Sequence, residues 1–246
     1  MKRRNVLVGL GASLLAGCSK VGGSEPMQKL FGLAEDWHKG FQRTLGGREA
    51  LAREFSPADI SPYFRSNGTN DPGTASYAEH EAAGFADWRL DVTGLVELPL
   101  SLSMAQIRAL PQRTQITRHD CVEGWSAIGK WHGVPLAAIL GAAGLSTRAK
   151  YIVFHCADRF GDRQYYESID LIDAFHPQTI LAWAMNDRLL PVPNGAPLRL
   201  RVERQLGYKQ AKYIQRIEAV ESLAGVYGGR GGYWEDTNDY EWYAGI

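Results

Sequence analysis

The stretch that decides the fold is Arg118-His119-Asp120-Cys121-Val122-Glu123-Gly124-Trp125-Ser126, where one cysteine joins a strand-like run to a polar turn. Thr114 to His119 alternates in polarity and predicts a strand that leads directly into Cys121. Because side chains of a strand alternate between its faces, His119 and Cys121 are expected on the same side. A thiolate beside a glycine-containing turn indicates a metal ligand or a nucleophile, and an inert buried cysteine is the alternative.

Around this stretch, the sequence predicts short strands and helices without a regular βαβ alternation. Helices are expected from Leu102 to Leu110 and from Leu136 to Leu145, the second with Pro135 in its first turn. Proline and Asn-Gly signals predict an irregular segment from Ser56 to Ser76. Strands are expected at Trp88 to Val92, Tyr151 to Cys156, Thr179 to Ala184, Leu198 to Val202 and Lys212 to Val220. This mixture predicts an α+β fold.

The composition favours one globular domain that acts on a small molecule or a protein. The chain has 246 residues, 45% of them hydrophobic, and 27 Lys and Arg balance 27 Asp and Glu. It is long enough to bury a sizeable core, whereas a nucleic-acid partner would require a strongly positive face. The three cysteines, Cys18, Cys121 and Cys156, form no Cys-x-x-Cys pair and indicate neither a disulfide framework nor a structural zinc site.

Residues 1 to 18 predict export from the cytoplasm. Met1 to Arg4 is positively charged, Val6 to Leu15 is a short apolar run, and Leu15-Ala16-Gly17-Cys18 has the small residues that a signal peptidase requires. This ending resembles a bacterial lipobox, so we expect lipidation of Cys18, with an ordinary signal peptide or a buried helix as the alternatives. Arg3-Arg4-Asn5-Val6-Leu7 is similar to a twin-arginine export signal, or is a generic basic segment. A periplasmic protein, anchored to the membrane by its lipid, is expected.

A tether and then the folded domain are expected to follow the export signal. Residues 19 to 29 are rich in glycine, serine, lysine and proline. From Leu30 to about Phe55, apolar residues at helical spacing predict an amphipathic helix. The domain is therefore expected to run from residue 30 to residue 246.

The segment Arg118 to Leu140, RHDCVEGWSAIGKWHGVPLAAIL, resembles the molybdopterin-binding domain of the sulfite oxidase family. The similarity includes the cysteine and a Trp-x-Gly-x-Pro-Leu entry into a helix, here Trp131 to Leu136. It implies a sulfite-oxidase-like fold with mixed sheets and short helices, in which Cys121 is the catalytic residue and ligates the molybdenum of a molybdopterin cofactor. A soft thiolate suits such a thiophilic metal.

Four further segments resemble the family in the same order along the chain. They are Phe64 to Gly68, His155 to Asp158, Asn194 to Arg199 and Gly207 to Lys212. A pterin and a phosphate require amide, carboxylate, backbone and cationic partners. The resemblance implies that the residues that hold the cofactor are Asn67, Asp158, Asn194, Arg199, Gln210, Ala211 and Lys212.

Two positions depart from the sulfite oxidases proper and affect the expected substrate. Those enzymes carry sulfite-binding arginines where this chain has Ser66 and Ser126. Arg65 and Lys130 are substitute cations or merely exposed residues. The segment from Cys121 to Ser126 is more similar to bacterial methionine-sulfoxide reductase catalytic subunits, which implies two-electron oxygen-atom transfer, with reduction of a sulfoxide or related S- or N-oxide. Sulfite dehydrogenation is the alternative.

Motifs that the sequence lacks bear on the expected electron donor and on functions other than a molybdoenzyme. It has no Cys-x-x-Cys-His haem site, so electrons are expected to come from a separate haem protein or cytochrome. A non-catalytic periplasmic binding lipoprotein is the alternative from another class. A zinc hydrolase that uses Cys121, His119 and His132 lacks the usual His-Glu-x-x-His signature. The ending, Gly228 to Asp236 and Glu241 to Tyr243, lies outside the similar region and is expected to be a packed strap or a wall of the site.

Overall fold

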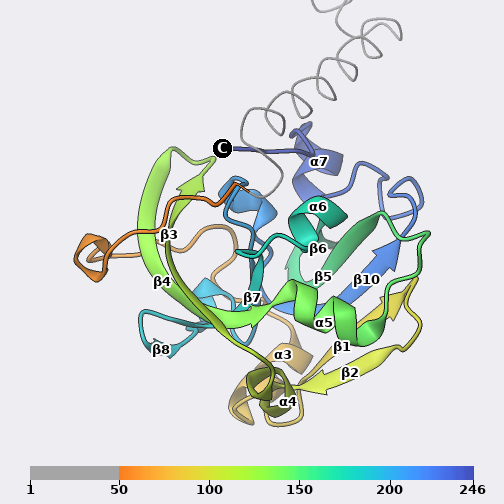
Figure 1. Cartoon of the computed structure of the whole chain (residues 1–246), viewed down its shortest axis with the longest axis horizontal. Helices are drawn as coiled ribbons and strands as arrows, with labels where there is room; N and C mark the ends of the chain where they lie inside the picture. Colours follow the sequence, from red (N-terminus) through yellow and green to blue (C-terminus); the bar gives the residue numbers. More distant parts are fainter. Residues whose placement is uncertain (1–49) are drawn as a thin grey trace, which may run out of the picture. The chain divides into compact units, whose positions relative to one another are not determined.

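Two five-stranded sheets form the framework of residues 50 to 246, the part of the chain that this computed structural model describes (Figure 1). The first sheet has the order β2-β1-β10-β5-β6, and its β1–β10 pair is parallel while the other pairs are antiparallel. The second has the order β3-β4-β7-β8, with β9 paired to β7, and all its pairs are antiparallel. The α+β prediction is therefore confirmed.

The longest strands form two antiparallel hairpins, β3–β4, which carries the cysteine, and β5–β6. Their bounds are β1 (Arg89–Gly94), β2 (Leu100–Ser103), β3 (Arg113–Cys121), β4 (Trp125–Pro135), β5 (Tyr151–Phe160), β6 (Arg163–Asp170), β7 (Ile180–Met185), β8 (Arg188–Leu189), β9 (Arg199–Arg201) and β10 (Ile214–Val220). The helices are η1 (Pro57–Asp59), α3 (Ala75–Ala82), α4 (Met104–Ala109), α5 (Leu136–Ala143), α6 (Leu171–Ala174), η2 (Val192–Asn194), η3 (Gly207–Lys209) and α7 (Tyr233–Asn238).

The main hydrophobic core joins the two sheets. It combines Leu90 and Val92 of β1 and Phe154 of β5 with Leu181 of β7 and Leu200 of β9. Helix α5 adds its apolar face, because Leu136, Ile139, Leu140 and Ala143 are fully buried. This core fixes the sheets against each other, so that residues from distant segments meet at one site.

Most predicted elements are confirmed with small shifts. The expected helix from Leu102 begins at Met104, because the Ser103 side chain accepts a hydrogen bond from the Gln106 amide and caps it, while Leu100–Ser103 forms β2. Pro135 is the N-cap residue of α5 rather than part of its first turn. The strand expected from Tyr151 continues to Phe160, so Asp158 lies within β5 and not at its end.

Two long strands were missing from the sequence prediction. β4 follows the Cys121 turn directly and pairs with β3 and with β7, and its buried positions include Gly129 and Gly133. Glycine has low strand propensity, so the Trp-x-Gly-x-Pro-Leu run was interpreted only as the entry into a helix. β6 pairs with β5 through a tight turn at Gly161.

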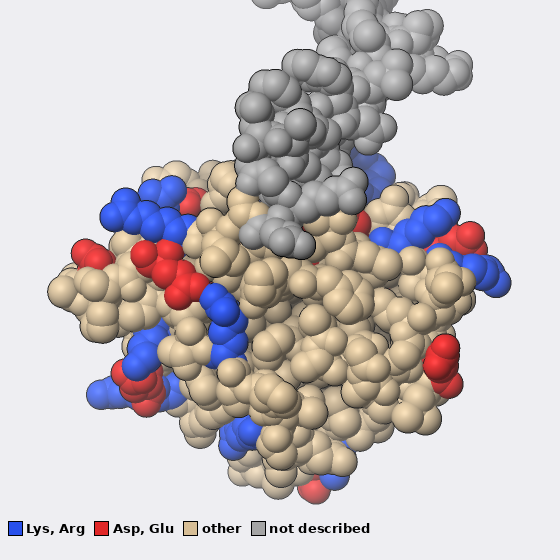
Figure 2. Space-filling view, viewed as in Figure 1, with Lys and Arg blue, Asp and Glu red and all other residues tan. Residues whose placement is uncertain are grey.

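The predicted export signal, residues 1 to 18 with Cys18, lies outside the described residues, as do the tether, residues 19 to 29, and the start of the domain at residue 30. The described residues fall in one compact unit that ends at Ile246. None of the helices described between residues 50 and 246 is long and apolar enough to cross a membrane. On the face drawn in Figure 2, both signs of charge mix near the edges around a broad uncharged centre.

Candidate functional site

Cys121 is the last residue of β3, at the hairpin to β4. Cys121 pairs with Trp125 across the turn, and the Gly124 amide donates to the Cys121 carbonyl at 3.0 Å. Gly124 has a φ of +84°, a conformation that glycine adopts without strain. The Cys121 side chain is 8% exposed, and burial raises the pKa of its thiol. An approaching metal that stabilises the thiolate would offset this cost of ionisation.

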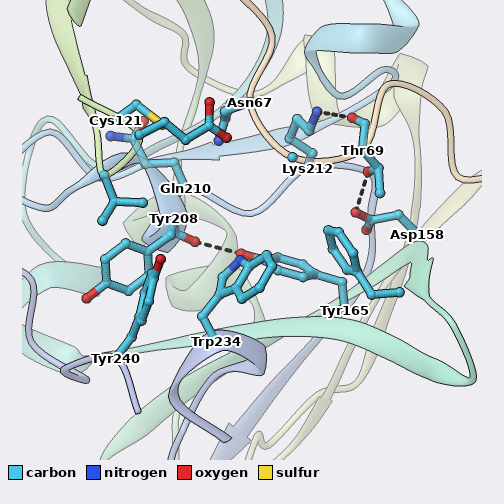
Figure 3. A pocket seen from close by; sticks show the side chains of 14 residues that line it. Asn67, Thr69, Cys121, Asp158, Tyr165, Tyr208, Gln210, Lys212, Trp234 and Tyr240 are labelled. Atoms are coloured by element: carbon cyan, nitrogen blue, oxygen red, sulfur yellow. Dashed lines mark hydrogen bonds between the residues drawn. The ribbon is translucent and has the colours of Figure 1, made fainter. Parts of the chain in front are cut away.

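A pocket opens beside Cys121 (Figure 3). Its cavity volume is about 150 Å³, and it is open to solvent at its mouth. Five stretches of the described chain supply its lining: the 67–69 loop, the β3–β4 turn, the β5–β6 hairpin, the segment from η3 to Lys212, and the C-terminal part around α7. The lining residues are Asn67, Gly68, Thr69, Cys121, Val122, Glu123, Asp158, Phe160, Tyr165, Tyr208, Gln210, Lys212, Trp234 and Tyr240.

One part of this pocket, which we call the polar end, consists of Asn67, Thr69, Asp158, Gln210 and Lys212. The Thr69 hydroxyl donates to Asp158 Oδ2 at 2.7 Å. Lys212 Nζ donates to the Pro193 carbonyl at 2.9 Å, to Ser66 Oγ at 3.3 Å and to the Thr69 carbonyl. Burial raises the pKa of Asp158 to about 6, and burial together with Arg199 lowers the pKa of Lys212 to about 7. The structure thus brings residues from three distant segments to one place.

The other predicted cofactor-binding residues lie behind the polar end. Arg199 is fully buried, and its Nη1 donates to the Asn194 carbonyl at 2.9 Å while Nη2 donates to the Gln210 carbonyl at 3.4 Å. Asn194 is 8% exposed, and the main chain of Ala211 is held by the Leu200 amide at 2.8 Å. Arg199 and Lys212 are therefore not solvated strand residues.

The polar groups of this region fit a large polar ligand. Within the described part of the chain, five of the residues predicted to hold the cofactor each have one buried polar atom that lacks a hydrogen-bond partner. These atoms are Asn67 Oδ1, Asp158 Oδ1, Asn194 Nδ2, Arg199 Nε and Gln210 Oε1. Because buried polar groups are almost always paired in native proteins, this concentration indicates a missing polar partner. A pterin with a phosphate offers both donors and acceptors.

His119 is buried behind Cys121, on the same face of β3, as predicted. Its Nδ1 accepts from Arg201 Nη1 at 3.0 Å, and Arg201 is paired with Glu203 through contacts of 2.6 and 3.0 Å. Burial, with Arg201 and Arg199, lowers the pKa of His119 well below its ordinary value, so the ring is neutral. This layer stiffens the strand that presents Cys121.

The zinc-site hypothesis is wrong for the described residues. His132 lies away from His119, since its Nδ1 is 2.7 Å from the Thr114 hydroxyl and its ring contacts Trp183. Within residues 50 to 246, no group of three or more His, Cys, Asp and Glu side chains could hold a metal ion.

The aromatic part of the pocket was not predicted, except that a wall of the site was one of two expectations for the C-terminal segment that contains Trp234. We call it the aromatic end: Phe160, Tyr165, Tyr208, Trp234 and Tyr240. Trp234 stacks on Tyr240 with ring centroids 5.9 Å apart, and Tyr208 meets Tyr240 edge-on at 5.0 Å. The only sequence signal was the run of aromatic residues after Gly232, for which a wall of the site was one of two expectations.

The candidate substitutes for the missing arginines occupy different places. Arg65 is exposed, lies 6.0 Å from the Trp125 ring and lowers the pKa of Cys121, though less than burial raises it. Lys130 instead pairs with Asp187 at 2.6 Å on the surface. Ser126 donates to Asp120 at 2.5 Å, and Ser66 donates to the Pro193 carbonyl at 2.5 Å. Of the two cations, only Arg65 lies near Cys121.

A strand-end thiol beside a pocket of unpaired polar groups defines a protein that binds a large polar cofactor. Residues 77 to 225 match the family model described as the oxidoreductase molybdopterin binding domain. A protein of Azospira oryzae, provisionally named protein-methionine-sulfoxide reductase subunit YedZ1, is 38% identical over 99% of this chain and 86% of its own length. The chain belongs to the sulfite oxidase family of molybdopterin-binding oxidoreductases, so it is an enzyme and its cofactor is molybdopterin.

Two further comparisons concern a curated relative and a solved structure. The protein-methionine-sulfoxide reductase catalytic subunit MsrP of Gluconobacter oxydans is 35% identical over 63% of this chain and 52% of its own. The crystal structure of the sulfane dehydrogenase SoxCD from Paracoccus pantotrophus superposes with a TM-score of 0.53 at 20% identity, over 71% of this chain and 46% of its own. The sulfite-oxidase-like fold is thereby confirmed, and the chain spans about half the length of these two relatives.

Proposed function

We propose that this enzyme reduces a sulfoxide, or a related uncharged S- or N-oxide, by oxygen-atom transfer. The observation that carries the proposal is the charge of the pocket lining. Among the described residues that line it, Glu123 and Asp158 are acidic and Lys212 is the single cation. Lys212 belongs to the polar end, which we assign to the cofactor, so an anion such as sulfite finds no second cation among these lining residues. The names of the MsrP relatives agree with this substrate class.

Each part of the pocket has a separate role in this proposal. Bound molybdopterin supplies the two-electron oxygen-atom transfer chemistry. Cys121 ligates the metal, and the polar end with Asn194, Arg199 and Ala211 holds the pterin and phosphate. The aromatic end excludes water from the substrate and offers ring faces to a sulfur centre, since sulfur packs favourably against aromatic rings.

The proposal is tested by assaying the purified holoenzyme with two substrates. With reduced viologen as donor, methionine sulfoxide should be turned over, whereas sulfite with ferricyanide as acceptor should not. Arg65 is the one cation near Cys121, so sulfite turnover that Arg65→Met abolishes would favour the sulfite dehydrogenase alternative instead.

A cysteine substitution tests the role of Cys121. Cys121→Ser should keep the cofactor through its pterin and phosphate contacts and lose turnover to the assay background. Cys156→Ser is the matched control, because Cys156 is the other buried free cysteine of the described chain and does not line the pocket. Full activity of Cys121→Ser would contradict the metal-ligand assignment.

We further propose that the enzyme is periplasmic, exported by the twin-arginine route, lipid-anchored through Cys18 and reduced by a separate haem or cytochrome carrier. The supporting features are the Arg3-Arg4 pair, the Leu-Ala-Gly-Cys ending of the apolar run and the absence of a Cys-x-x-Cys-His motif. Mass spectrometry of the mature N-terminus should find a diacylated Cys18, and an unmodified residue at the N-terminus would contradict the anchor.

A further inference from the structure

A buried lysine joins the pocket to the C-terminal segment. Lys209 of η3 is fully buried between Glu167 of β6 and Glu235 of α7, whose side chains are no more than 1% exposed. Lys209 Nζ contacts Glu235 Oε1 at 2.5 Å and also pairs with Glu167 Oε2, which the Ser168 amide approaches at 3.1 Å. We call these three residues the Lys209 cluster.

The charges of the Lys209 cluster do not balance if both carboxyls are ionised. Two carboxylates and one ammonium would leave a net negative charge in the interior, where an uncompensated charge is strongly destabilising. The neighbouring titratable groups do not supply a positive charge. Burial raises the pKa values of Tyr165, Tyr166 and Tyr208, and also that of the Cys156 thiol, so these groups stay neutral.

The polar groups of Asp236 and Glu241 on the C-terminal segment are hydrogen-bonded outside the Lys209 cluster. Asp236 is bound elsewhere, by the Tyr166 hydroxyl at 2.6 Å and by the amides of Gly228 and Arg230. The carbonyl of Glu241 accepts from the Tyr208 hydroxyl at 2.6 Å. The balance of charge must therefore be reached within the Lys209 cluster itself.

The geometry shows where a proton would go. Glu167 Oε1 and Glu235 Oε2 are both buried and lack a hydrogen-bond partner among the described residues. Both face Gly232, since a Cβ atom there would lie 2.3 Å from Glu167 Oε1 and 2.0 Å from Glu235 Oε2. Gly232 has an extended φ of −166°, so glycine is needed there for space and not for conformation. Because both oxygens lie beside Gly232 and each belongs to a carboxyl whose other oxygen binds Lys209, one proton held between them would give both a partner.

We propose that Glu167 and Glu235 share one proton, which makes the Lys209 cluster neutral and holds α7 against the pocket. Burial, and then Glu235, raise the pKa of Glu167 well above its ordinary value, in agreement with this assignment.

The Lys209 cluster is next to the aromatic end in the chain as well as in space. Tyr208 precedes Lys209, Trp234 precedes Glu235, and both aromatic side chains line the pocket. Tyr165, two residues before Glu167, donates its hydroxyl to the Tyr208 carbonyl at 2.7 Å. Glu167, Lys209 and Glu235 are thus positioning residues for the wall that faces the substrate.

The shared proton gives the docking of α7 a defined pH dependence. With α7 docked, Glu167 keeps its proton above the ordinary pKa of a glutamate, 4.5, whereas release of α7 exposes the carboxyl and lets it ionise. Docking is therefore complete below that value and weakens as pH rises, by up to about tenfold per pH unit, until the raised pKa of the cluster is passed. Above it, the buried negative charge favours release.

Hydrogen exchange of the holoenzyme between pH 5 and pH 9 tests the proposal. After correction for intrinsic exchange rates, the protection of the α7 amides should fall with pH in the wild type. Glu235→Gln should keep that protection and make it independent of pH, because its amide donates permanently to Glu167 and its carbonyl still accepts from Lys209. Glu235→Leu should lose the protection at every pH. Asp239→Asn, an exposed position on the same segment, is the control with wild-type behaviour.

Two outcomes would overturn the shared proton. One is a Glu235→Gln variant that keeps the pH dependence of the wild type, and the other is a Glu235→Gln variant that loosens α7 as much as Glu235→Leu. Glu167→Gln is the mirror variant and should also give pH-independent protection. It keeps the test decisive if either single variant folds poorly, because the two substitutions place the permanent amide on opposite sides of the pair.

Discussion

The two ends of the pocket differ in how their polar groups are satisfied. At the polar end and just behind it, five residues leave a buried atom without a partner in the described structure, including Asp158 Oδ1 and Gln210 Oε1. At the aromatic end, the hydroxyls of Tyr165 and Tyr208 already donate to main-chain carbonyls within the protein. The polar end is therefore prepared for a ligand that completes it, whereas the aromatic end is complete by itself and acts as a wall.

The family model covers part of each end. It includes Asp158, Gln210 and Lys212 of the polar end and Phe160, Tyr165 and Tyr208 of the aromatic end, whereas Asn67 and Thr69 precede it and Trp234 and Tyr240 follow it. The similarity to the Azospira oryzae protein extends over 99% of this chain, so the α7 side of the wall lies within the region that these two proteins share.

The largest effect that would test the difference between the two ends is a pH dependence of the free energy of unfolding, and it arises from Asp158 at the polar end. The pKa of Asp158 is raised from 3.8 to about 6, so the native state binds its proton more tightly than the unfolded state does. Protonated Asp158 contributes at most about 3 kcal/mol to the free energy of unfolding. This contribution is complete below pH 3.8 and is lost as the pH rises through 6. Asp158→Asn removes this dependence. Urea unfolding of the cofactor-free protein measures this. Between pH 4 and pH 7, the free energy of unfolding of the variant should rise relative to that of the wild type, and an equal change in both proteins would contradict the prediction.

A somewhat smaller effect is expected from the loss of the lysine at the polar end. Lys212→Met removes a buried ammonium, and hydrogen bonds to charged groups contribute about 1.5 to 3 kcal/mol, so cofactor retention should fall by about 10- to 100-fold. The molybdenum content after gel filtration measures this. Lys130→Met is the control, because Lys130 forms only a surface pair with Asp187. Equal molybdenum in both variants would remove Lys212 from the cofactor site.

The smallest effect is expected at the aromatic end. Trp234→Ala removes one face of the wall, so KM for the sulfoxide should rise by about tenfold with little change in kcat, as for a lost ground-state contact. Molybdenum content should stay at the wild-type level, in contrast to Lys212→Met. Trp183→Ala is the control, since Trp183 contacts His132 and Arg108 and does not line the pocket. A loss of cofactor from the Trp234 variant would erase the distinction between the two ends.

Four of the five residues of the polar end, all except Thr69, stand in short segments that resemble the family, and the structure brings these segments together in one pocket. Cys121 ends an alternating strand, whereas the roles predicted for Asp158 and Lys212 rest on the resemblance and not on a local pattern. The fold class and the shared face of His119 and Cys121 follow from periodicity alone, and the structure confirms both.

The aromatic end as a whole could not be predicted, because its members meet only through the tertiary fold, although a wall of the site was one expectation for the segment with Trp234. Tyr165 lies on β6, Tyr208 on η3 and Trp234 on α7, and no local pattern links them. The Lys209 cluster is a stronger case, since three ordinary charged residues become unusual only through complete burial. β4 was missed for a different reason, because its glycines oppose the strand propensity that pairing with β3 and β7 overrides.

The position of α7 in the chain has a consequence for the order of assembly. Trp234 and Tyr240 follow every other residue that lines the pocket, so the ribosome makes them last. The polar end has all its side chains once Lys212 has been synthesised, but the pocket cannot close on the α7 side before Trp234 and Tyr240 exist. The order of synthesis thus leaves an interval in which the cofactor-binding groups are present and the wall is not.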